Sequence, residues 1–176
     1  CMIEHIPDLI DAGIDSLKVE GRMKTALYVA TVARTYRKAL DDYAEDPDLY
    51  EKNMDWYLDQ ISNCTYRQFT TGFFYGKPDH EAQIYDSNTY VKEYTYLGII
   101  GDVAPDGRIH IEQRNKFVVG EQIEIMKPDG ANIEAKVLSI RNDDGEEMES
   151  APHSKQSLWV LLDQPGAQYD LLRRKE

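Results

Sequence analysis

The segment that decides the fold reads Asp15-Ser16-Leu17-Lys18-Val19-Glu20-Gly21-Arg22-Met23-Lys24. We expect a short strand over Ser16–Val19 that ends in a Glu-Gly-Arg turn, because glycine lets the backbone turn sharply. A long helix is predicted over 22–44, where apolar residues recur at spacings of three and four without an interrupting glycine or proline. Strand, turn and helix in this order indicate an α/β unit.

The residues before this segment predict a short helix over 4–12, which Gly13 is suited to end. One α/β unit cannot close a sheet, so we expect it to be the last part of a larger parallel-stranded domain upstream. The first residue is Cys1 and not methionine. The simplest interpretation is that the true N-terminus lies further upstream.

A second helix should begin at Asp46-Pro47, because aspartate caps free backbone N–H groups and proline at the first helical position loses no hydrogen bond. The short connection before it favours an antiparallel helical pair. Residues 65–79 are irregular and rich in aromatic side chains. We interpret them as a linker that packs on its neighbours, and a base-stacking or substrate-covering loop is the alternative.

From residue 79 onward, short apolar alternations are separated by Pro-Gly and Asp-Gly turns, which is typical of an antiparallel barrel or sandwich. We favour a barrel, because closure hides the strand edges. His110 should point away from the core, and the apolar run Leu158–Leu162 should be buried on both faces. The fold class is therefore α+β: the end of an α/β (TIM-like) domain and a helical pair over 1–78, then a small antiparallel β-barrel domain over 79–176.

The composition excludes several classes of protein. A net charge of −12 argues against a surface that binds nucleic acid through overall positive charge, so RNA would need local basic patches such as Arg34–Lys38 or Arg173–Lys175. No signal peptide and no apolar run of membrane-spanning length is present, so no membrane partner is expected. Two cysteines make a disulfide framework improbable and favour a reducing cytoplasm, and Cys64 reads as a structural thiol.

The best candidates for chemistry are Glu20 and Arg22, which follow the end of a predicted strand, where active sites of parallel α/β folds gather. The carboxylate can act as acid or base, and the guanidinium can hold a carboxylate or phosphate. Lys24 is a candidate for substrate contact. The alternative is a salt bridge at the start of a helix. No HExxH, CxxC, GxSxG or phosphate-binding glycine loop is present.

A second polar candidate lies in the β region, where Gln113–Phe117 reads as a turn between two strands. Arg114 and Asn115 could bind an anionic part of a substrate there. A solvated hairpin is the more common explanation of such a sequence.

Seven segments of the chain, in order, strongly resemble the peptidase U32 (collagenase-like protease) family. These are Cys1–Pro7, Gly13–Lys24, Tyr28–Ala30, Tyr36-Arg37, Thr71–Phe73, Gln113–Asn115 and Ala151–His153. The resemblance implies a TIM-like domain upstream, whose last units are residues 1–45, and a separate C-terminal β-barrel from about residue 80.

The resemblance also implies function. Some members are named for collagenase-like proteolysis, and others are tRNA wobble-uridine or ribosomal RNA hydroxylation proteins, the former dependent on prephenate. Related proteins carry a [4Fe-4S] cluster on four cysteines, and Cys1 matches the last of them. Cys1 would be an iron–sulfur ligand only together with upstream cysteines, so no cofactor is expected in this chain alone. Arg22 could bind a carboxylate donor such as prephenate.

Three hypotheses follow. The first is an RNA-modifying enzyme of the tRNA wobble-uridine hydroxylation type, with tRNA or another RNA as partner. The second is a metal-dependent or collagenase-like peptidase that acts on a protein or peptide. The third is a non-catalytic module whose barrel binds RNA, protein or saccharide.

Overall fold

The structure is a computed structural model that describes residues 1–64, 69–77 and 94–176. The chain forms two compact units, Cys1–Glu93 and Tyr94–Glu176, and each is treated by itself. The boundary expected between residues 78 and 79 lies outside the described residues. None of the helices in the described part of the chain has the length and apolar character needed to cross a bilayer.

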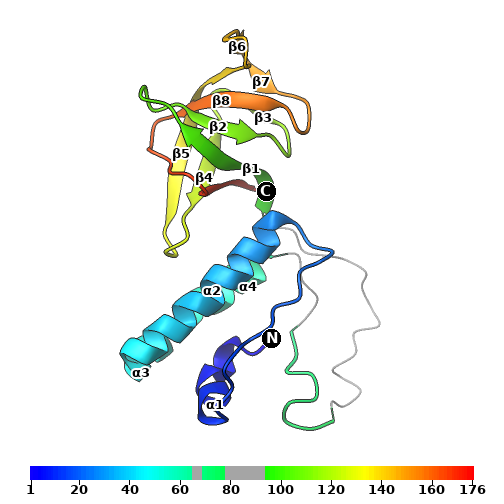
Figure 1. The fold of residues 1–176 in the computed structure, drawn as a ribbon, viewed down its shortest axis with the longest axis vertical. Helices are drawn as coiled ribbons and strands as arrows, with labels where there is room; N and C mark the ends of the chain where they lie inside the picture. The colour runs from blue at the N-terminus through cyan, green and yellow to red at the C-terminus, as the bar shows by residue number, and fades with distance from the viewer. Residues whose placement is uncertain (65–68, 78–93) are drawn as a thin grey trace. The chain divides into compact units, whose positions relative to one another are not determined.

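The first unit is helical (Figure 1). Its elements are η1 (Ile3–His5), α1 (Ile6–Asp11), α2 (Ala26–Glu45), α3 (Pro47–Lys52) and α4 (Met54–Ser62). The Thr25 side chain caps α2 by accepting a hydrogen bond from Tyr28 N at 3.2 Å. Asp46 caps α3 by accepting one from Asp48 N at 3.0 Å, which confirms the helix start predicted from Asp46-Pro47.

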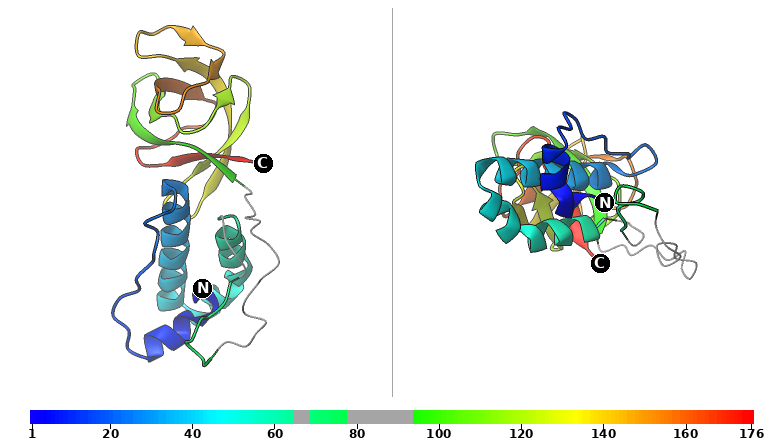
Figure 2. Two further views of the ribbon diagram at one scale, coloured as in Figure 1. Left: turned by 90° about the vertical axis from the view of Figure 1, so that its right-hand side faces the viewer. Right: turned by 90° about the horizontal axis from the view of Figure 1, so that it is seen from below.

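Two helix predictions need correction. The long helix begins at Ala26 and not at residue 22, because the chain first makes a turn closed by the bond from Lys24 N to Gly21 O at 2.9 Å. The second helix is interrupted at Asn53, so that α3 and α4 are separate elements. Figures 1 and 2 show α2 and α4 running side by side, as the predicted helical pair requires.

The strand predicted over Ser16–Val19 is not formed. Residues 14–20 are an extended segment without regular secondary structure, and Ile14 and Val19 are about two fifths exposed. A strand needs a neighbour to pair its N–H and C=O groups. The described residues of this unit contain no other strand.

The core of the helical unit joins α1 to the long helices. Its buried members are Ile3, Ile6, Leu9, Ala39, Tyr50, Tyr57 and Ile61. Tyr50 and Tyr57 stack with ring centroids 5.8 Å apart, and the Tyr50 hydroxyl donates to Ile3 O at 2.7 Å. That bond ties the start of the chain to α3 and satisfies a polar group inside the core.

Asp42 is a buried carboxylate on α2 that holds the helices together. It accepts hydrogen bonds from Asn53 Nδ2 at 2.8 Å, from Lys38 Nζ at 3.0 Å and from the Tyr57 hydroxyl. Burial alone would raise its pKa, but the hydrogen bonds from Tyr57, Asn53 and Lys38 and the charge of Lys38 hold that pKa below its usual range.

The second unit is an antiparallel sheet that closes on itself (Figure 1). Its strands are β1 (Tyr94–Val103), β2 (Ile109–Glu112), β3 (Phe117–Val118), β4 (Gln122–Met126), β5 (Asn132–Arg141), β6 (Glu147–Met148), β7 (Ser150–Ala151), β8 (Ser157–Leu162) and β9 (Leu171–Lys175). The main sheet has the order β4-β9-β1-β2-β8-β5-β6, and an additional β4–β5 pairing completes the ring. Because the sheet closes into a ring, few strand edges are left without a hydrogen-bonded neighbour, as expected for a small sheet.

The inside of this ring is a single apolar core. Its fully buried members include Leu97, Ile100, Ile109, Ile111, Ile125, Val137, Ile140, Leu158, Val160 and Leu172. The run Leu158–Leu162 alternates between buried and partly exposed residues, so the prediction that it is buried on both faces is wrong. Trp159 is one of the partly exposed residues. His110 points away from the core, as predicted.

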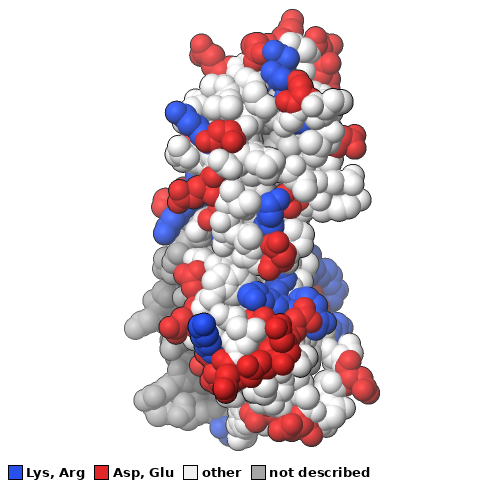
Figure 3. Space-filling view, turned by 90° about the vertical axis from the view of Figure 1, so that its left-hand side faces the viewer, with Lys and Arg blue, Asp and Glu red and all other residues white. Residues whose placement is uncertain are grey.

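The basic clusters considered for RNA are largely neutralised by acidic partners. Arg173 is 1% exposed and its Nε donates to Glu124 at 2.5 Å, and Arg174 pairs with Glu121 at 2.7 Å. Arg37 pairs with Asp41 at 2.5 Å in the helical unit. Figure 3 shows acidic and basic atoms interspersed over the drawn face. These two clusters therefore do not form the open basic patches that RNA binding through them would need.

Candidate functional site

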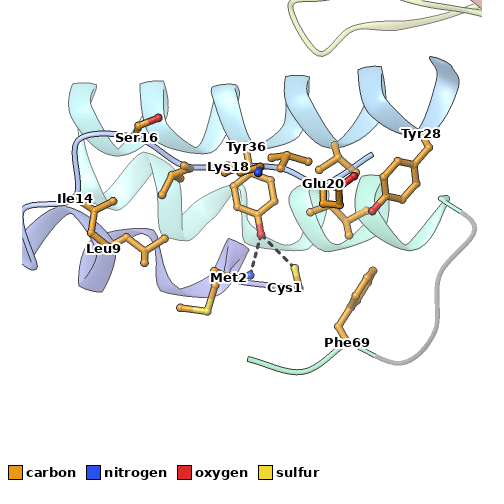
Figure 4. A pocket seen from close by; sticks show the side chains of 14 residues that line it. Cys1, Met2, Leu9, Ile14, Ser16, Lys18, Glu20, Tyr28, Tyr36 and Phe69 are labelled. Carbon is orange, nitrogen blue, oxygen red and sulfur yellow. Dashed lines mark hydrogen bonds between the residues drawn. The ribbon is translucent and has the colours of Figure 1, made fainter. Parts of the chain in front are cut away.

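The helical unit contains a cavity of about 510 Å³ beside α2 (Figure 4). Most of its wall is apolar, and polar groups enter from the extended segment 14–20, the chain start and α2. The lining residues are Cys1, Met2, Leu9, Ile14, Ser16, Leu17, Lys18, Val19, Glu20, Tyr28, Val32, Tyr36, Ile61 and Phe69. A volume of this size suits a small organic molecule.

Glycine brings the extended segment close to α2 at one end of the cavity. A Cβ built on Gly21 would lie 2.8 Å from Val29 Cγ2, so a side chain at this position would require either Val29 or the segment to move. The glycine of the Glu-Gly-Arg turn therefore has a steric role. It brings Glu20, which precedes it, to the cavity wall.

Cys1 lies on the cavity wall and is exposed. Its Sγ is 3.5 Å from the Tyr36 hydroxyl, which also accepts a hydrogen bond from Met2 N at 2.8 Å (Figure 4). Across this contact either the hydroxyl or the thiol can be the donor, since a hydroxyl that accepts from Met2 N keeps its own proton and a second lone pair. Tyr36 thus fixes the chain start against α2, a role that sequence reasoning missed because its spacing marks it as a core residue.

The predicted Glu20–Arg22 pair is present but weak. Glu20 Oε1 accepts from Arg22 N at 2.9 Å, while Arg22 Nε stays 4.0 Å from it with its side chain 84% exposed. Exposed pairs of this kind contribute at most about 1 kcal/mol. Lys24 Nζ lies 5.2 Å from the centre of the Tyr28 ring. Of these three predicted residues only Glu20 lines the cavity.

Lys18 is a further polar residue of the cavity that was not predicted as a site residue. It is exposed, and it comes from the same extended segment as Glu20. An ammonium and a carboxylate at one apolar cavity can orient a small ligand that carries charge of both signs. The signal available in the sequence was the alternation of Lys18 and Glu20 with Leu17 and Val19.

The number and positions of the cysteines decide whether this chain alone could hold an iron–sulfur cluster. A [4Fe-4S] cluster is held by four thiolates, and the chain has Cys1 and Cys64. Cys64 is buried, with its Sγ 4.0 Å from Gln60 O. Over residues 1–64, 69–77 and 94–176, no three His, Cys, Asp or Glu side chains gather as a metal site would need. Cys1 is exposed and could be at most one of four ligands, so a cluster would need three thiolates from elsewhere.

The predicted residues Arg114 and Asn115 belong to the second unit. Arg114 Nη2 pairs with Glu112 at 2.7 Å, and Asn115 Nδ2 donates to Tyr96 O at 2.6 Å. Both side chains therefore have partners within the β unit. Their neighbour Gln113 is fully buried and donates to Ala151 O at 2.6 Å, so the expected solvated turn is partly a structural anchor.

Two family models match the chain. The model described as peptidase family U32 matches residues 1–84, and the one described as the peptidase family U32 C-terminal domain matches residues 92–173. The two matches together run along both structural units.

Curated relatives agree with these models. The chain is 34% identical to tRNA hydroxylation protein P1 of Bacillus subtilis over 174 residues. This match covers 98% of this chain and 41% of the relative. It is 32% identical to tRNA hydroxylation protein P of Escherichia coli, over 92% of this chain and 35% of the relative. Identity to a collagenase of Porphyromonas gingivalis is 30%, over 79% of this chain and 39% of the relative. The chain spans between 35% and 41% of the length of these relatives.

Proposed function

The chain belongs to peptidase family U32, and we propose that it acts in the hydroxylation of a tRNA nucleoside. The observation that carries this proposal is the similarity to tRNA hydroxylation protein P1 of Bacillus subtilis, which extends over 98% of the chain. A tRNA substrate agrees with the cytoplasmic location expected from the low cysteine content.

The cavity of the helical unit supports the proposal. Lys18 and Glu20 place one positive and one negative charge at an apolar space large enough for a small organic co-substrate. Arg22 is exposed and only loosely paired, so it can bind a carboxylate such as that of prephenate with two parallel hydrogen bonds. In this proposal Lys18 and Glu20 of the cavity wall orient the donor molecule, and Arg22, which lies outside that wall, binds its carboxylate.

Cys1 extends the proposal to a cofactor. It would be one thiolate ligand of a [4Fe-4S] cluster, which would supply redox chemistry beside the cavity. Iron and acid-labile sulfide are to be measured in the intact protein, purified without oxygen, beside Cys1→Ala and the control Cys64→Ala. About four of each per chain in the parent and in Cys64→Ala, and their loss in Cys1→Ala, are expected. Equal content in Cys1→Ala and the parent would remove Cys1 from the ligand set.

The hydroxylation proposal is tested in cells that lack the gene. Nucleosides of total tRNA are compared by mass spectrometry, and one that is heavier than its precursor by an oxygen atom should disappear and return with the parent gene. Complementation with Lys18→Ala should restore it poorly. The matched control is Lys52→Ala, an exposed lysine of α3 that is not part of the cavity wall. An unchanged nucleoside profile in the deletion strain would contradict the proposal.

A peptidase is the second candidate, favoured by the similarity to the Porphyromonas gingivalis collagenase. Glu20 would then have to serve a metal or a water molecule. The described residues offer it no partner set of metal ligands, so any metal site would have to draw on residues outside them. Cleavage of gelatin by the pure protein, abolished in Glu20→Gln and retained in Lys52→Ala, would favour this candidate over hydroxylation.

A further inference from the structure

A row of three side chains crosses the outer face of the β unit. The strands β2, β8 and β5 are neighbours in the sheet (Figure 1). Trp159 on β8 is in register with His110 on β2 and with Arg141 on β5. Directly paired residues on one face of a sheet lie within contact distance of each other. The His110 and Trp159 rings are tilted by 54°, with their centroids 5.0 Å apart.

The inward neighbours of this row fix its position. Ile109 and Val160 are paired and almost fully buried in the core of the ring, and Ile140 pairs with Val160 on the other side. Because side chains alternate between the faces of a sheet, burial of these three residues turns His110, Trp159 and Arg141 outward. An indole held in this way is a rigid, partly exposed aromatic surface.

A small hollow lies beside the indole. It has a volume of about 290 Å³ and is lined by Ala104, Asp106, Arg108, Arg141, Asn142, Asp143, Gly145 and Trp159. This is just below the usual range for ligand sites, about 300–1,000 Å³. The space therefore suits a single planar ring system better than an extended polymer segment.

Two guanidinium groups, those of Arg108 and Arg141, contribute to the polar lining of the hollow. Arg108 is bound through its Nη1 to Asp106 at 2.5 Å, but its buried Nε has no hydrogen-bond partner among the described residues. This buried Nε is closed off from solvent, so the part of Arg108 that can donate to a ligand in the hollow is the rest of its guanidinium group. The second guanidinium, Arg141, is bound through Nε to Glu147 at 2.6 Å with its side chain 38% exposed.

Charge around the hollow sets the kind of contact it can make. Asp106 and Glu147 offset the two guanidinium groups, and Asp143 adds a further carboxylate on the wall. Such a site attracts phosphate groups weakly. It offers instead an aromatic face and directional N–H donors, which match the ring and the carbonyl oxygens of a nucleobase.

We propose that Trp159 is the stacking platform for an unpaired nucleobase of RNA, with Arg108 and Arg141 as donors to its edge. This inference rests on the proposed action on tRNA and names where that RNA is held. Single-stranded loops are the parts of a folded RNA whose bases are free to stack on a protein side chain. Bases within a duplex remain stacked on one another and cannot enter the hollow.

Intrinsic fluorescence provides a direct test, because the chain has two tryptophans, Trp56 and Trp159, one in each unit. In a Trp56→Phe variant of the full chain, Trp159 is the sole indole reporter. A short single-stranded RNA oligonucleotide should quench its emission, and a blunt duplex of the same sequence should not. Absence of quenching by the single strand would overturn the inference.

Affinity for a labelled single strand separates stacking from other contacts. Trp159→Ala should weaken binding about 5- to 150-fold, the range for loss of one stacked base, and Trp159→Phe should restore most of it. Leu161→Ala is the matched control, since Leu161 is also partly exposed on β8 but lies outside the hollow. Equal affinity of Trp159→Ala and Leu161→Ala would refute the role of Trp159.

The charge balance adds a second criterion. Because few phosphates are contacted at a site with offset charges, binding through Trp159 should depend only weakly on salt concentration. Removal of the planar donor in Arg108→Lys, which keeps the charge, should also weaken binding. A steep salt dependence that Trp159→Ala leaves unchanged would assign the RNA to another surface and overturn the inference. The tRNA analysis in the deletion strain decides the proposed function independently.

Discussion

The buried carboxylate of Asp42 offers the sharpest test of how the helical unit is held together. Asp42→Ala removes the common acceptor of Lys38, Asn53 and Tyr57, in a residue that is 6% exposed. The lysine loses its ionic partner, and the buried Tyr57 hydroxyl loses its acceptor. We expect the free energy of unfolding to fall by about 3–5 kcal/mol, the usual cost of breaking a buried charged network.

The neighbouring aspartate is the matched control. Asp41 pairs with Arg37 at the same helical spacing of four residues as Asp42 with Lys38, but both members of the Asp41–Arg37 pair are 64% exposed. Exposed pairs of this kind contribute about 0.3–0.5 kcal/mol. Asp41→Ala should therefore leave the unfolding free energy nearly unchanged.

Urea unfolding is the assay, with Trp159→Phe as the background so that Trp56 on α4 reports on the helical unit. The midpoint for Asp42→Ala should move to much lower urea, while that for Asp41→Ala should stay near the parent. If the two variants differ by less than about 1 kcal/mol, the buried network is not what stabilises the unit, and the argument from Asp42 fails.

Three further predictions concern pH and close packing. Because the pKa of Asp42 is lowered in the folded state, its contribution to the free energy of unfolding is complete above the unfolded-state pKa of about 4 and is lost as pH falls below that value. Asp42→Asn should therefore make the free energy of unfolding less dependent on pH in the acid range. Burial raises the pKa of Tyr50 to about 12, so stability should fall between about pH 10 and 12 in the parent, and less in Tyr50→Phe. A Cβ on Gly98 would meet Glu112 O at 3.1 Å, so Gly98→Ala should lower the melting temperature more than Gly101→Ala, whose nearest contact is 3.5 Å.

Features of the fold that depend on local chemistry could be predicted from the sequence. Asp46 and Pro47 determine a helix start within their own turn, and the structure has it there. The alternation around His110 likewise decides which side chain faces out, because the register of a strand with one buried face is fixed by its apolar residues.

Features of the fold that depend on partners distant in sequence could not be predicted in this way. Ser16–Val19 has a suitable composition for a strand, but pairing needs a neighbour that the described residues of the unit do not supply. The run Leu158–Leu162 was misjudged for a different reason. Its apolar composition suggested that both faces of the strand are buried. In the structure the large Trp159 side chain lies on the outer face, where His110 and Arg141 flank it.

The candidate site shows the same division. Glu20 was predicted because it follows the end of an expected strand, and it lines the cavity although that strand is not formed. A Cβ on its neighbour Gly21 would crowd Val29. That Cys1 lies on the same cavity wall depends on its contact with Tyr36, which is 35 residues away in sequence. A spacing pattern describes Tyr36 as a core residue, and only the fold reveals that its hydroxyl faces the cysteine.

A kinetic experiment distinguishes the roles proposed for Lys18 and Trp159. Lys18 is assigned to the cavity in which a co-substrate would be oriented for reaction, so Lys18→Ala should lower kcat for tRNA hydroxylation. Trp159 is assigned to a stacking contact that is equal in the bound substrate and in the transition state. A contact of that kind contributes uniform binding, so Trp159→Ala should raise KM for tRNA and leave kcat nearly unchanged. A fall in kcat without a change in KM for Trp159→Ala would mean that this side chain acts in the reaction itself, and the assignment of a passive platform would be wrong.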